Sequence, residues 1–241
     1  MDNPENEIDN YWKNNFNDDK IINVGKDLQA NVARTKKGKS VTVEDWTKTI
    51  QSLISTLKIN RESNVLELCC GNGVLLGELA PYCDFAVGVD YSNKLLDQFR
   101  NHYTDRNIEL VFADVRNFEI KENFFNTIII YFSIQHFDER DTFLLIKKCI
   151  KSLKKDGQIY IGDIPDLEKK WIYIDRRKYH QDYFNRVVNR KPKIGYWFQK
   201  DFFKAMNSCF PKATFQIISQ PDYQINSDHC FDVLIKKHGT N

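Results

Sequence analysis

The stretch 65-VLELCCGNGVLLG-77 decides the fold, because it leads from a strand-like run directly into a turn rich in glycine. Its apolar first part is typical of a buried strand, and the glycines let the backbone come close to a ligand or to another segment. The spacing G-x-G-x-x-x-G differs from the G-x-G-x-x-G of dinucleotide-binding proteins, which disfavours a nicotinamide enzyme. Cys69 and Cys70 stand at the turn, and a reactive thiol is the first hypothesis for them.

Length and composition limit the class of protein. A chain of 241 residues suits one α/β domain with some extra cover, or at most two small domains. A net charge of +2 and a pI of about 8.1 are too weakly basic to indicate a nucleic-acid binder. The first ten residues, MDNPENEIDN, lack the basic and apolar regions of a signal peptide, and no apolar run reaches about 18 residues. The six cysteines include no C-x-x-C pair, so we expect reduced thiols in a cytoplasmic protein without a membrane span.

Strand-like and helix-like segments alternate through the middle of the chain. We expect strands at 64–69, 85–90, 108–112, 127–133 and 158–163, with helices at 74–80, 93–103 and 139–153. Buried strands that alternate with amphipathic helices predict a mostly parallel sheet with helices on both faces. The tail has a helix at 199–208 and then two strands, 213–219 and 230–236, with no helix between them. We therefore expect a seven-stranded sheet in which a final antiparallel hairpin closes one edge.

The segments outside this alternation differ from it in composition. Residues 1–60 are predicted to form an N-terminal helical lid or cap, in which Thr42 caps a helix that ends near Asn60. Residues 61–241 are predicted to form the main domain. Within it, residues 164–198 are expected to be an irregular insertion rich in basic and aromatic residues.

Polar residues follow the predicted parallel strands, at the edge of the sheet where open α/β folds bind ligands. Backbone N–H groups of Gly71 and Gly73 are expected to face a carboxylate or phosphate at the start of a helix. A carboxylate in the place of Asp90 can accept hydrogen bonds from a ribose diol. Asp114 can accept from an exocyclic amine such as that of adenine. Glu67, the run 133-SIQH-136 and Asp163 end the other strands.

Five blocks together resemble the class I S-adenosylmethionine-dependent methyltransferases, in particular the branch that acts on sugars, antibiotics and similar small molecules. They are 65-VLELCCGNG-73, 87-VGVDYS-92, 111-VFADVRNF-118, 125-FNTIIIYFSIQHF-137 and 153-LKKDGQIYIGD-163, with 231-FDVLIKK-237 in the place of the family's last strand. The resemblance implies a Rossmann-like α/β fold with a seven-stranded, mostly parallel sheet and an antiparallel last strand. It also implies S-adenosylmethionine as cofactor and S-adenosylhomocysteine as product.

The same resemblance implies roles for individual residues around the cofactor. The methionine part would face Glu67 and the turn, the ribose would bind one acid with a tyrosine beside the adenine, and the sulfonium would lie over the end of the fourth strand. The residues in question are Glu67, Cys70, Gly71, Gly73, Asp90, Tyr91, Asp114, Val115, Tyr131 and Ser133. Tyr11 and Trp12 would either fold over the cofactor as a lid or dock on the rim of the sheet.

Two positions depart from the family pattern. Cys69 stands where glycine is usual, so one close approach of the backbone is expected to be looser. Asn126 stands where an acid is usual, at a position that is normally structural. Transfer from a sulfonium to the acceptor is direct and needs no thiol, so the resemblance makes a nucleophilic cysteine unnecessary.

Methylation of a hydroxyl needs a base, because an alcohol must lose its proton as it attacks. His136 is the predicted base, since it follows the fourth strand and can be neutral at cytosolic pH. Asp163 is predicted to orient that base, share its role or hold an acceptor hydroxyl. The alternatives are that His136 only caps the helix starting near Asp138 and that Asp163 is a loop carboxylate. Asp163 and Asp166 lack a third partner for a metal site, so no metal is expected.

The insertion suggests the character of the acceptor. Residues 168–193 hold nine lysines or arginines and three acids, with five aromatic residues interleaved. This pattern indicates either a solvated face or a lid that binds an anionic acceptor, such as a nucleotide-sugar, a phosphorylated glycan or RNA. Tyr196 and Trp197 would either line the acceptor site or pack in the core, and His229 is expected at the surface.

The sequence therefore predicts O-methylation of a sugar, nucleotide-sugar or glycan hydroxyl by in-line displacement. N-methylation of a small amine and methylation of RNA remain alternatives, although the fourth block lacks the Asn/Asp-Pro-Pro-Tyr pattern of enzymes that methylate nucleic-acid bases. A non-catalytic, cofactor-binding regulatory subunit is a third. The acceptor and the oligomeric state stay open at this stage.

Overall fold

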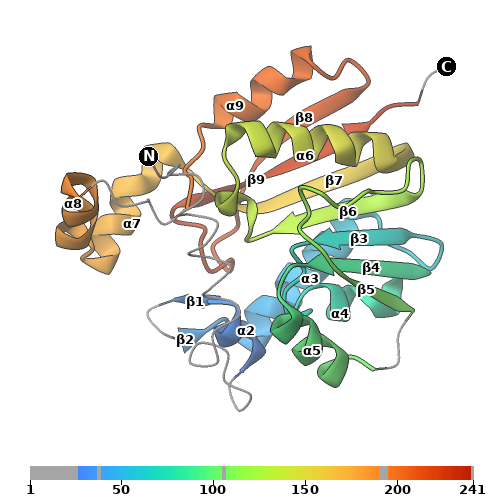
Figure 1. Cartoon of the computed structure of the whole chain (residues 1–241), viewed down its shortest axis with the longest axis horizontal. Helices are drawn as coiled ribbons and strands as arrows, with labels where there is room; N and C mark the ends of the chain where they lie inside the picture. Colours follow the sequence, from blue (N-terminus) through green and yellow to red (C-terminus); the bar gives the residue numbers. More distant parts are fainter. Residues whose placement is uncertain (1–26, 37–38, 105–106, 190–194, 240–241) are drawn as a thin grey trace.

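A computed structural model of the chain describes residues 27–36, 39–104, 107–189 and 195–239. Its main sheet has seven strands in the order β5-β4-β3-β6-β7-β9-β8 (Figure 1). The strands are β3 (Asn64–Leu68), β4 (Phe85–Asp90), β5 (Ile108–Phe112), β6 (Phe125–Tyr131), β7 (Leu153–Pro165), β8 (Ala213–Ser219) and β9 (Cys230–Lys237). Neighbours from β5 to β7 pair in parallel, and β9 is antiparallel to both β7 and β8. The predicted fold, with its antiparallel last strand, is confirmed.

The helices include α2 (Leu28–Asn31), α3 (Val43–Leu57), α4 (Leu76–Leu79), α5 (Asn93–His102), α6 (Glu139–Ser152), α7 (Lys170–Arg177), α8 (His180–Val188) and α9 (Lys200–Ala205). Short 3-10 turns lie at η1 (Ala80–Tyr82), η2 (Ile134–His136), η3 (Leu167–Lys169) and η4 (Met206–Ser208), and β1 (Thr35–Lys36) pairs with β2 (Lys39–Ser40). None of the described helices is long and apolar enough to cross a membrane.

Side-chain caps fix where three of the helices begin. The hydroxyl of Thr42 accepts from the N–H of Asp45, and that of Ser92 from the N–H of Leu95, because the first N–H groups of a helix have no partner within it. A carboxylate caps α6, where Asp138 accepts from the N–H of Asp141 at 2.7 Å. Since Asp138 has this role, the alternative that His136 caps the helix is wrong.

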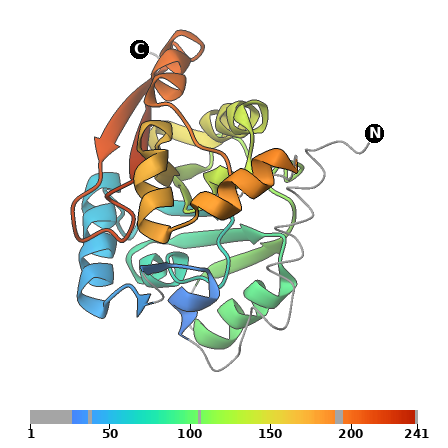
Figure 2. The same ribbon diagram turned by 90° about the vertical axis from the view of Figure 1, so that its left-hand side faces the viewer.

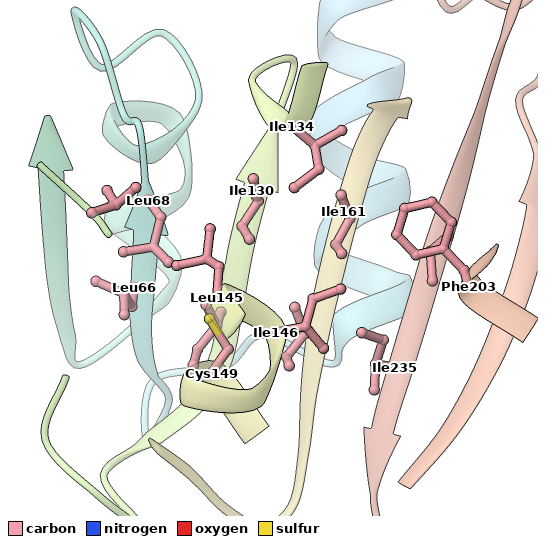
Figure 3. Packing of buried hydrophobic residues seen from close by; sticks show 14 of the residues in the cluster. Leu66, Leu68, Ile130, Ile134, Leu145, Ile146, Cys149, Ile161, Phe203 and Ile235 are labelled. Atoms are coloured by element: carbon pink, nitrogen blue, oxygen red, sulfur yellow. The ribbon is translucent and has the colours of Figure 1, made fainter. Parts of the chain in front are cut away.

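Helices cover both faces of the sheet, as the alternation predicts. On one face, α6 and α9 pack onto alternate strand residues through Leu145, Ile146 and Phe203 (Figure 3). On the other face, α3, α4 and α5 close a second core around Leu53 and Phe99. Both cores bury continuous apolar surface, which is the main favourable contribution to folding.

The insertion is more ordered than expected. Residues 164–198 were predicted to be irregular, but they contain α7 and α8, which stand beyond the carboxyl ends of the parallel strands (Figures 1 and 2). Spacings of three and four residues place Lys170, Tyr173, Ile174 and Arg177 on one side of α7, and all four line a cavity below it. The sequence did not predict α7, because only one of its residues, Ile174, is buried and the helix therefore has no periodic row of apolar residues.

Candidate functional site

One cavity of about 650 Å³ lies at the carboxyl ends of the parallel strands, beneath α7 and α8. It adjoins β3 and β6, where the strand order changes direction, which is the usual ligand position in such sheets. The predicted site residues that line it are Glu67, Cys70, Gly71, Asp90, Tyr91, Asp114, Val115, Tyr131, Ser133, His136 and Asp163. Tyr11 and Trp12 lie outside the described residues, so their predicted role stays a prediction.

Three central strands end in a residue with left-handed backbone at this cavity. Cys69 follows β3 with φ 60°, Phe132 follows β6 with φ 56°, and Asp163 near the end of β7 has φ 58°. Such conformations are costly for residues with a side chain and cluster at functional sites. They turn the chain sharply at the point where each strand meets the cavity.

Asp90 organises the glycine-rich turn. Its Oδ2 accepts from the N–H of Gly71 at 2.8 Å, and its Oδ1 accepts from the N–H of Ser92 at 2.8 Å. The N–H of Gly73 donates to the carbonyl of Cys70. The expectation that these glycine N–H groups face a ligand is therefore wrong. Burial raises the pKa of Asp90 to about 6, and hydrogen bonds from the backbone of Ser92, Gly71 and Tyr91 oppose that rise.

Gly73 was predicted to line the cofactor site, but it does not line the cavity. It allows close packing instead. Its φ is 79°, and a Cβ at this position would lie 2.5 Å from the ring of Phe99 on α5. Only glycine allows α5 to pack this closely over the turn.

Glu67 lies at the base of the cavity, 3% exposed. Its Oε2 accepts from the N–H of Leu76 at 3.0 Å. Burial raises the pKa of Glu67 to about 8, and the positive charge of Arg34 opposes that rise. A cationic amine bound beside Glu67 would favour the ionised carboxylate.

Arg34 was not predicted from the sequence, although it lines the cavity and is only 4% exposed. Its guanidinium lies 4.2 Å from the ring centroid of Tyr131 and 4.7 Å from that of Trp46. Its Nη1 has no hydrogen-bond partner among the described residues. A buried cation without an ion-pair partner is costly, so this position is suited to an anionic ligand group. Nothing in the polar sequence around Arg34 distinguishes it from a surface arginine.

Asp114 holds an arginine in this structure. Both of its oxygens accept from Arg116, with Oδ2 2.6 Å from Nη2, and Arg116 also lies 3.6 Å from Asp141. A ligand amine at Asp114 would therefore share the carboxylate with this guanidinium. Val115 beside it is buried.

The two cysteines at the turn are not activated. Burial raises the pKa of both Cys69 and Cys70 well above the usual value, and the negative charge of Asp90 adds to the shift. The thiolate is the reactive form of cysteine, so these thiols are inert at neutral pH.

Asn126, which stands where the family usually has an acid, has a structural role. Its Oδ1 accepts from the N–H of Asn64 at 2.9 Å and joins the starts of β3 and β6.

His136 lies in η2 at the edge of the cavity. Burial lowers its pKa to about 3, so its imidazole stays neutral through the physiological range. The same shift makes it a weak proton acceptor, because a base works best when its pKa is near the working pH.

A buried pair of carboxylates stands at the end of β7. The amide Nε2 of Gln220 donates to Asp163 at 2.7 Å and to Asp232 at 2.6 Å, and the backbone N–H of Asp163 also donates to Asp232. Tyr160 donates its hydroxyl to Asp232. Burial and the nearby charge of Asp163 raise the pKa of Asp232 to about 7. Oδ2 of Asp163 has no hydrogen-bond partner among the described residues.

Cationic and aromatic side chains of the insertion form the opposite wall. Lys170, Arg177 and Arg186 line the cavity there, and Nζ of Lys170 donates to the hydroxyl of Tyr183 at 3.0 Å. One acid, Asp182, lines the same wall and pairs with Arg186 at 2.8 Å, so the wall keeps a net positive charge. Nε of Arg177 is buried without a hydrogen-bond partner among the described residues. This wall therefore suits an anion.

Three further residues of the insertion and tail are placed by the structure. Tyr196 and Trp197 both line the cavity. His229 lines it as well and is 5% exposed, so the expectation of a surface position is wrong. Its burial follows from Tyr173 and Trp197, whose rings cover it at centroid distances of 4.9 Å and 6.1 Å.

The carboxylate of Asp166 forms an ion pair with a lysine of this chain. Its carboxylate lies 2.7 Å from Nζ of Lys200 and is fully buried. Within the described ranges, no group of three His, Cys, Asp or Glu side chains could hold a metal ion.

Comparison with known proteins finds methyltransferases. Residues 65–157 match the methyltransferase domain family. A ubiquinone biosynthesis O-methyltransferase of Coxiella burnetii is 28% identical over 119 residues, which are 46% of this chain and 47% of the relative. The chain thus spans about half the length of such curated relatives.

Solved structures share the fold across nearly the whole chain. Phosphoethanolamine N-methyltransferase 1 of Haemonchus contortus, in complex with phosphoethanolamine and S-adenosylhomocysteine, superposes with a TM-score of 0.66 at 11% identity, covering 98% of this chain and 49% of that one. The N-methyltransferase NodS of Bradyrhizobium japonicum, with S-adenosylhomocysteine, superposes with a TM-score of 0.60 at 14% identity and covers 98% and 99%.

Residues 65–157 are thus similar to a methyltransferase domain, and the chain has the fold of the solved methyltransferases. These matches agree with the resemblance to methyltransferases that the sequence motifs predicted.

Proposed function

We propose that the chain transfers a methyl group from S-adenosylmethionine to a hydroxyl of a small anionic molecule, such as a nucleotide-linked sugar or a phosphorylated glycan. One observation carries this proposal. A single cavity joins the acid-bearing ends of β3 and β4 to the cationic wall of α7 and α8. The first part suits the cofactor, and the second suits an acceptor of negative charge.

Charge and hydrogen-bonding capacity support a position for the cofactor. Asp90 accepts from the ribose hydroxyls, with Tyr91 beside the adenine, and Asp114 with Val115 contacts the adenine edge. At the other end, Glu67 holds the amine of the methionine part. Arg34, whose buried Nη1 lacks a partner among the described residues, binds the carboxylate.

The acceptor lies between the sulfonium and the insertion. Its anionic group pairs with Lys170, Arg177 and Arg186, and its sugar ring packs on the tyrosines of this wall, since aromatic faces bind apolar ring surface well. Asp163 accepts a hydrogen bond through Oδ2 from a second hydroxyl of the acceptor, next to the one that reacts, and so orients the attacking oxygen.

The chemistry is an in-line displacement. The oxygen of the acceptor attacks the methyl carbon, the bond from carbon to sulfur breaks, and its electron pair stays on sulfur to give S-adenosylhomocysteine. The cofactor supplies the reactivity, while the protein aligns the atoms and excludes water. A histidine of the cavity wall takes the hydroxyl proton, and His136 is the base that the sequence predicts.

The proposal is tested by binding and by a screen of acceptors. Calorimetry with S-adenosylhomocysteine should show one site per chain, and no heat at millimolar ligand would contradict the cofactor assignment. Sugar nucleotides, phosphorylated sugars, small amines and RNA are then compared by release of S-adenosylhomocysteine. Transfer to neutral acceptors or RNA alone would contradict the anionic small-molecule acceptor.

A small amine that carries a phosphate is the second candidate acceptor. The carboxylate of Asp163 would then face a positively charged group, with the cationic wall around the phosphate. Phosphoethanolamine, the ligand of the solved Haemonchus contortus enzyme, is the first amine to include in the screen. If the protein binds the cofactor and methylates no acceptor, the result favours the third hypothesis, a non-catalytic subunit that binds S-adenosylmethionine.

A further inference from the structure

Two charged residues, Arg176 and Asp228, form a chain that ends at a cavity histidine, His229. Nδ1 of His229 lies 2.7 Å from Oδ1 of Asp228, and the other carboxylate oxygen, Oδ2, forms an ion pair with Arg176 of α7. A carboxylate only accepts hydrogen bonds, so Nδ1 must carry a hydrogen and donate the hydrogen bond to Asp228. The proton-accepting nitrogen of the neutral ring is then Nε2.

His229 is held rigidly in the cavity wall. The ring of Tyr173 covers it at 4.9 Å, and that of Trp197 lies at 6.1 Å. Its backbone carbonyl accepts from the N–H of Asp166 at 3.0 Å, which fixes it beside the end of β7. The imidazole therefore has one orientation, set by rings on α7 and on the segment before α9.

This arrangement differs from that of His136. Burial lowers the pKa of His136 to about 3, which makes its ring a weak proton acceptor. His229 has an ionised carboxylate on the far side of its ring, which stabilises the imidazolium that forms when a proton arrives. The two histidines line the same cavity, but only His229 is built to accept a proton and hold it.

We propose that His229 is the general base of the methyl transfer, with Asp228 and Arg176 as positioning residues. This inference rests on the proposed function. The hydroxyl proton of the acceptor moves to Nε2 of His229, the oxygen forms its bond to the methyl carbon, and the electron pair of the broken bond stays on sulfur. The imidazolium afterwards releases the proton to water when the product leaves.

Charges of opposite sign lie close to Nδ1 of His229. Asp228 favours the imidazolium, whereas Nη2 of Arg176 lies 3.5 Å from Nδ1 and disfavours it. Tyr173 and Cys230 are the other titratable groups beside the ring, and burial raises the pKa of both, so they stay uncharged. A neutral ring with a carboxylate behind it is the form that a base requires.

The ring state is tested first by NMR, which needs no acceptor. Nitrogen-15 spectra of the labelled protein, assigned with His229→Gln and His136→Gln, report the tautomer of each ring between pH 5 and 9. The proposal expects the Nδ1–H tautomer for His229 at pH 8, and Asp228→Asn should shift its population and its titration midpoint. A His229 ring in the Nε2–H tautomer would overturn the proposal.

Kinetics with an acceptor from the screen tests the base itself. His229→Gln should lower kcat by about 10²–10⁴-fold, while affinity for S-adenosylhomocysteine stays unchanged. Asp228→Asn should lower kcat less and displace the acidic limb of the pH profile. His238→Gln, on an exposed histidine that contacts Thr214, is the matched control and should act as wild type.

The outcomes separate this inference from the proposed function. If His136→Gln abolishes turnover and His229→Gln does not, methyl transfer stands and His229 is not the base. If the wild type binds S-adenosylhomocysteine but methylates none of the acceptors, both the proposed function and the base are contradicted. If His229→Gln weakens cofactor binding and kcat by the same factor, its role is structural and the proposal is wrong.

Discussion

Replacing Arg34 by methionine tests how the amino-acid end of the cofactor is held. The guanidinium is buried over Tyr131 and Trp46, and its Nη1 has no hydrogen-bond partner among the described residues. Methionine keeps much of the packing and removes the charge. A hydrogen bond to a charged group contributes about 1.5–3 kcal/mol, and about 1.4 kcal/mol corresponds to a factor of ten. We therefore expect Arg34→Met to weaken S-adenosylhomocysteine binding by about 10- to 150-fold.

The assay is calorimetry with two ligands. S-adenosylhomocysteine carries the carboxylate, whereas 5′-methylthioadenosine shares its adenosine and lacks the amino-acid tail. Arg34→Met should weaken the first ligand and leave the second unchanged. The melting temperature without ligand should stay the same or rise, because an unpaired buried charge has been removed.

A matched control uses an arginine outside the cavity. Arg100 pairs with Asp97 on the surface of α5, so Arg100→Met should bind both ligands as wild type does. Wild-type affinity for S-adenosylhomocysteine in Arg34→Met would refute the reasoning. So would an equal loss for the two ligands, since that would place the arginine at the adenosine end or in the folding of the site.

Three further predictions concern the glutamate, the turn and the cationic wall. The fold raises the pKa of Glu67 from its usual 4.5 to about 8, so between these values the native protein binds more protons than the unfolded chain. The free energy of unfolding therefore falls as pH rises across that window. Glu67→Gln should remove this fall in thermal melts at a series of pH values, and it should weaken the binding of S-adenosylhomocysteine. Gly73→Ala should cost about 3 kcal/mol or more in urea unfolding, through its positive φ and the ring of Phe99, whereas Gly71→Ala should cost about 1–2 kcal/mol from φ alone; equal losses would contradict this. Arg177→Gln should raise KM for an anionic acceptor about tenfold or more with cofactor affinity unchanged, and an unchanged KM would remove Arg177 from the acceptor site.

Local sequence patterns were enough to predict the fold. Continuous apolar strands, helix caps such as Ser92 and the turn after β3 each depend on residues close together in the chain. The acids at strand ends were predictable for the same reason, because parallel strands bring their carboxyl ends to one edge. All the described residues so predicted line the cavity, with the exception of Gly73.

The missed residues depend on contacts between distant segments. Arg34 becomes buried only because Tyr131 and Trp46 come together from β6 and α3. Asp232 lies within the apolar run of β9, and its partner Gln220 is in a loop with no motif. Periodicity carries no information about such pairs, so neither the carboxylate pair nor the setting of His229 could be read from the sequence.

The glycine turn shows the same limit within a short motif. Its spacing correctly indicated a tight approach of the backbone, but the group that approaches Gly73 is the ring of Phe99. The side chain that binds the N–H of Gly71 is Asp90, from the next strand. A motif thus predicts that space is needed, while the fold decides what fills it.

A crystal structure with S-adenosylhomocysteine tests the central claim most directly. The account predicts one molecule in the cavity, with its ribose hydroxyls on Asp90, its carboxylate on Arg34 and its sulfur facing the space between His229 and Asp163. S-adenosylhomocysteine bound elsewhere, or in this cavity with its ends reversed, would contradict the account.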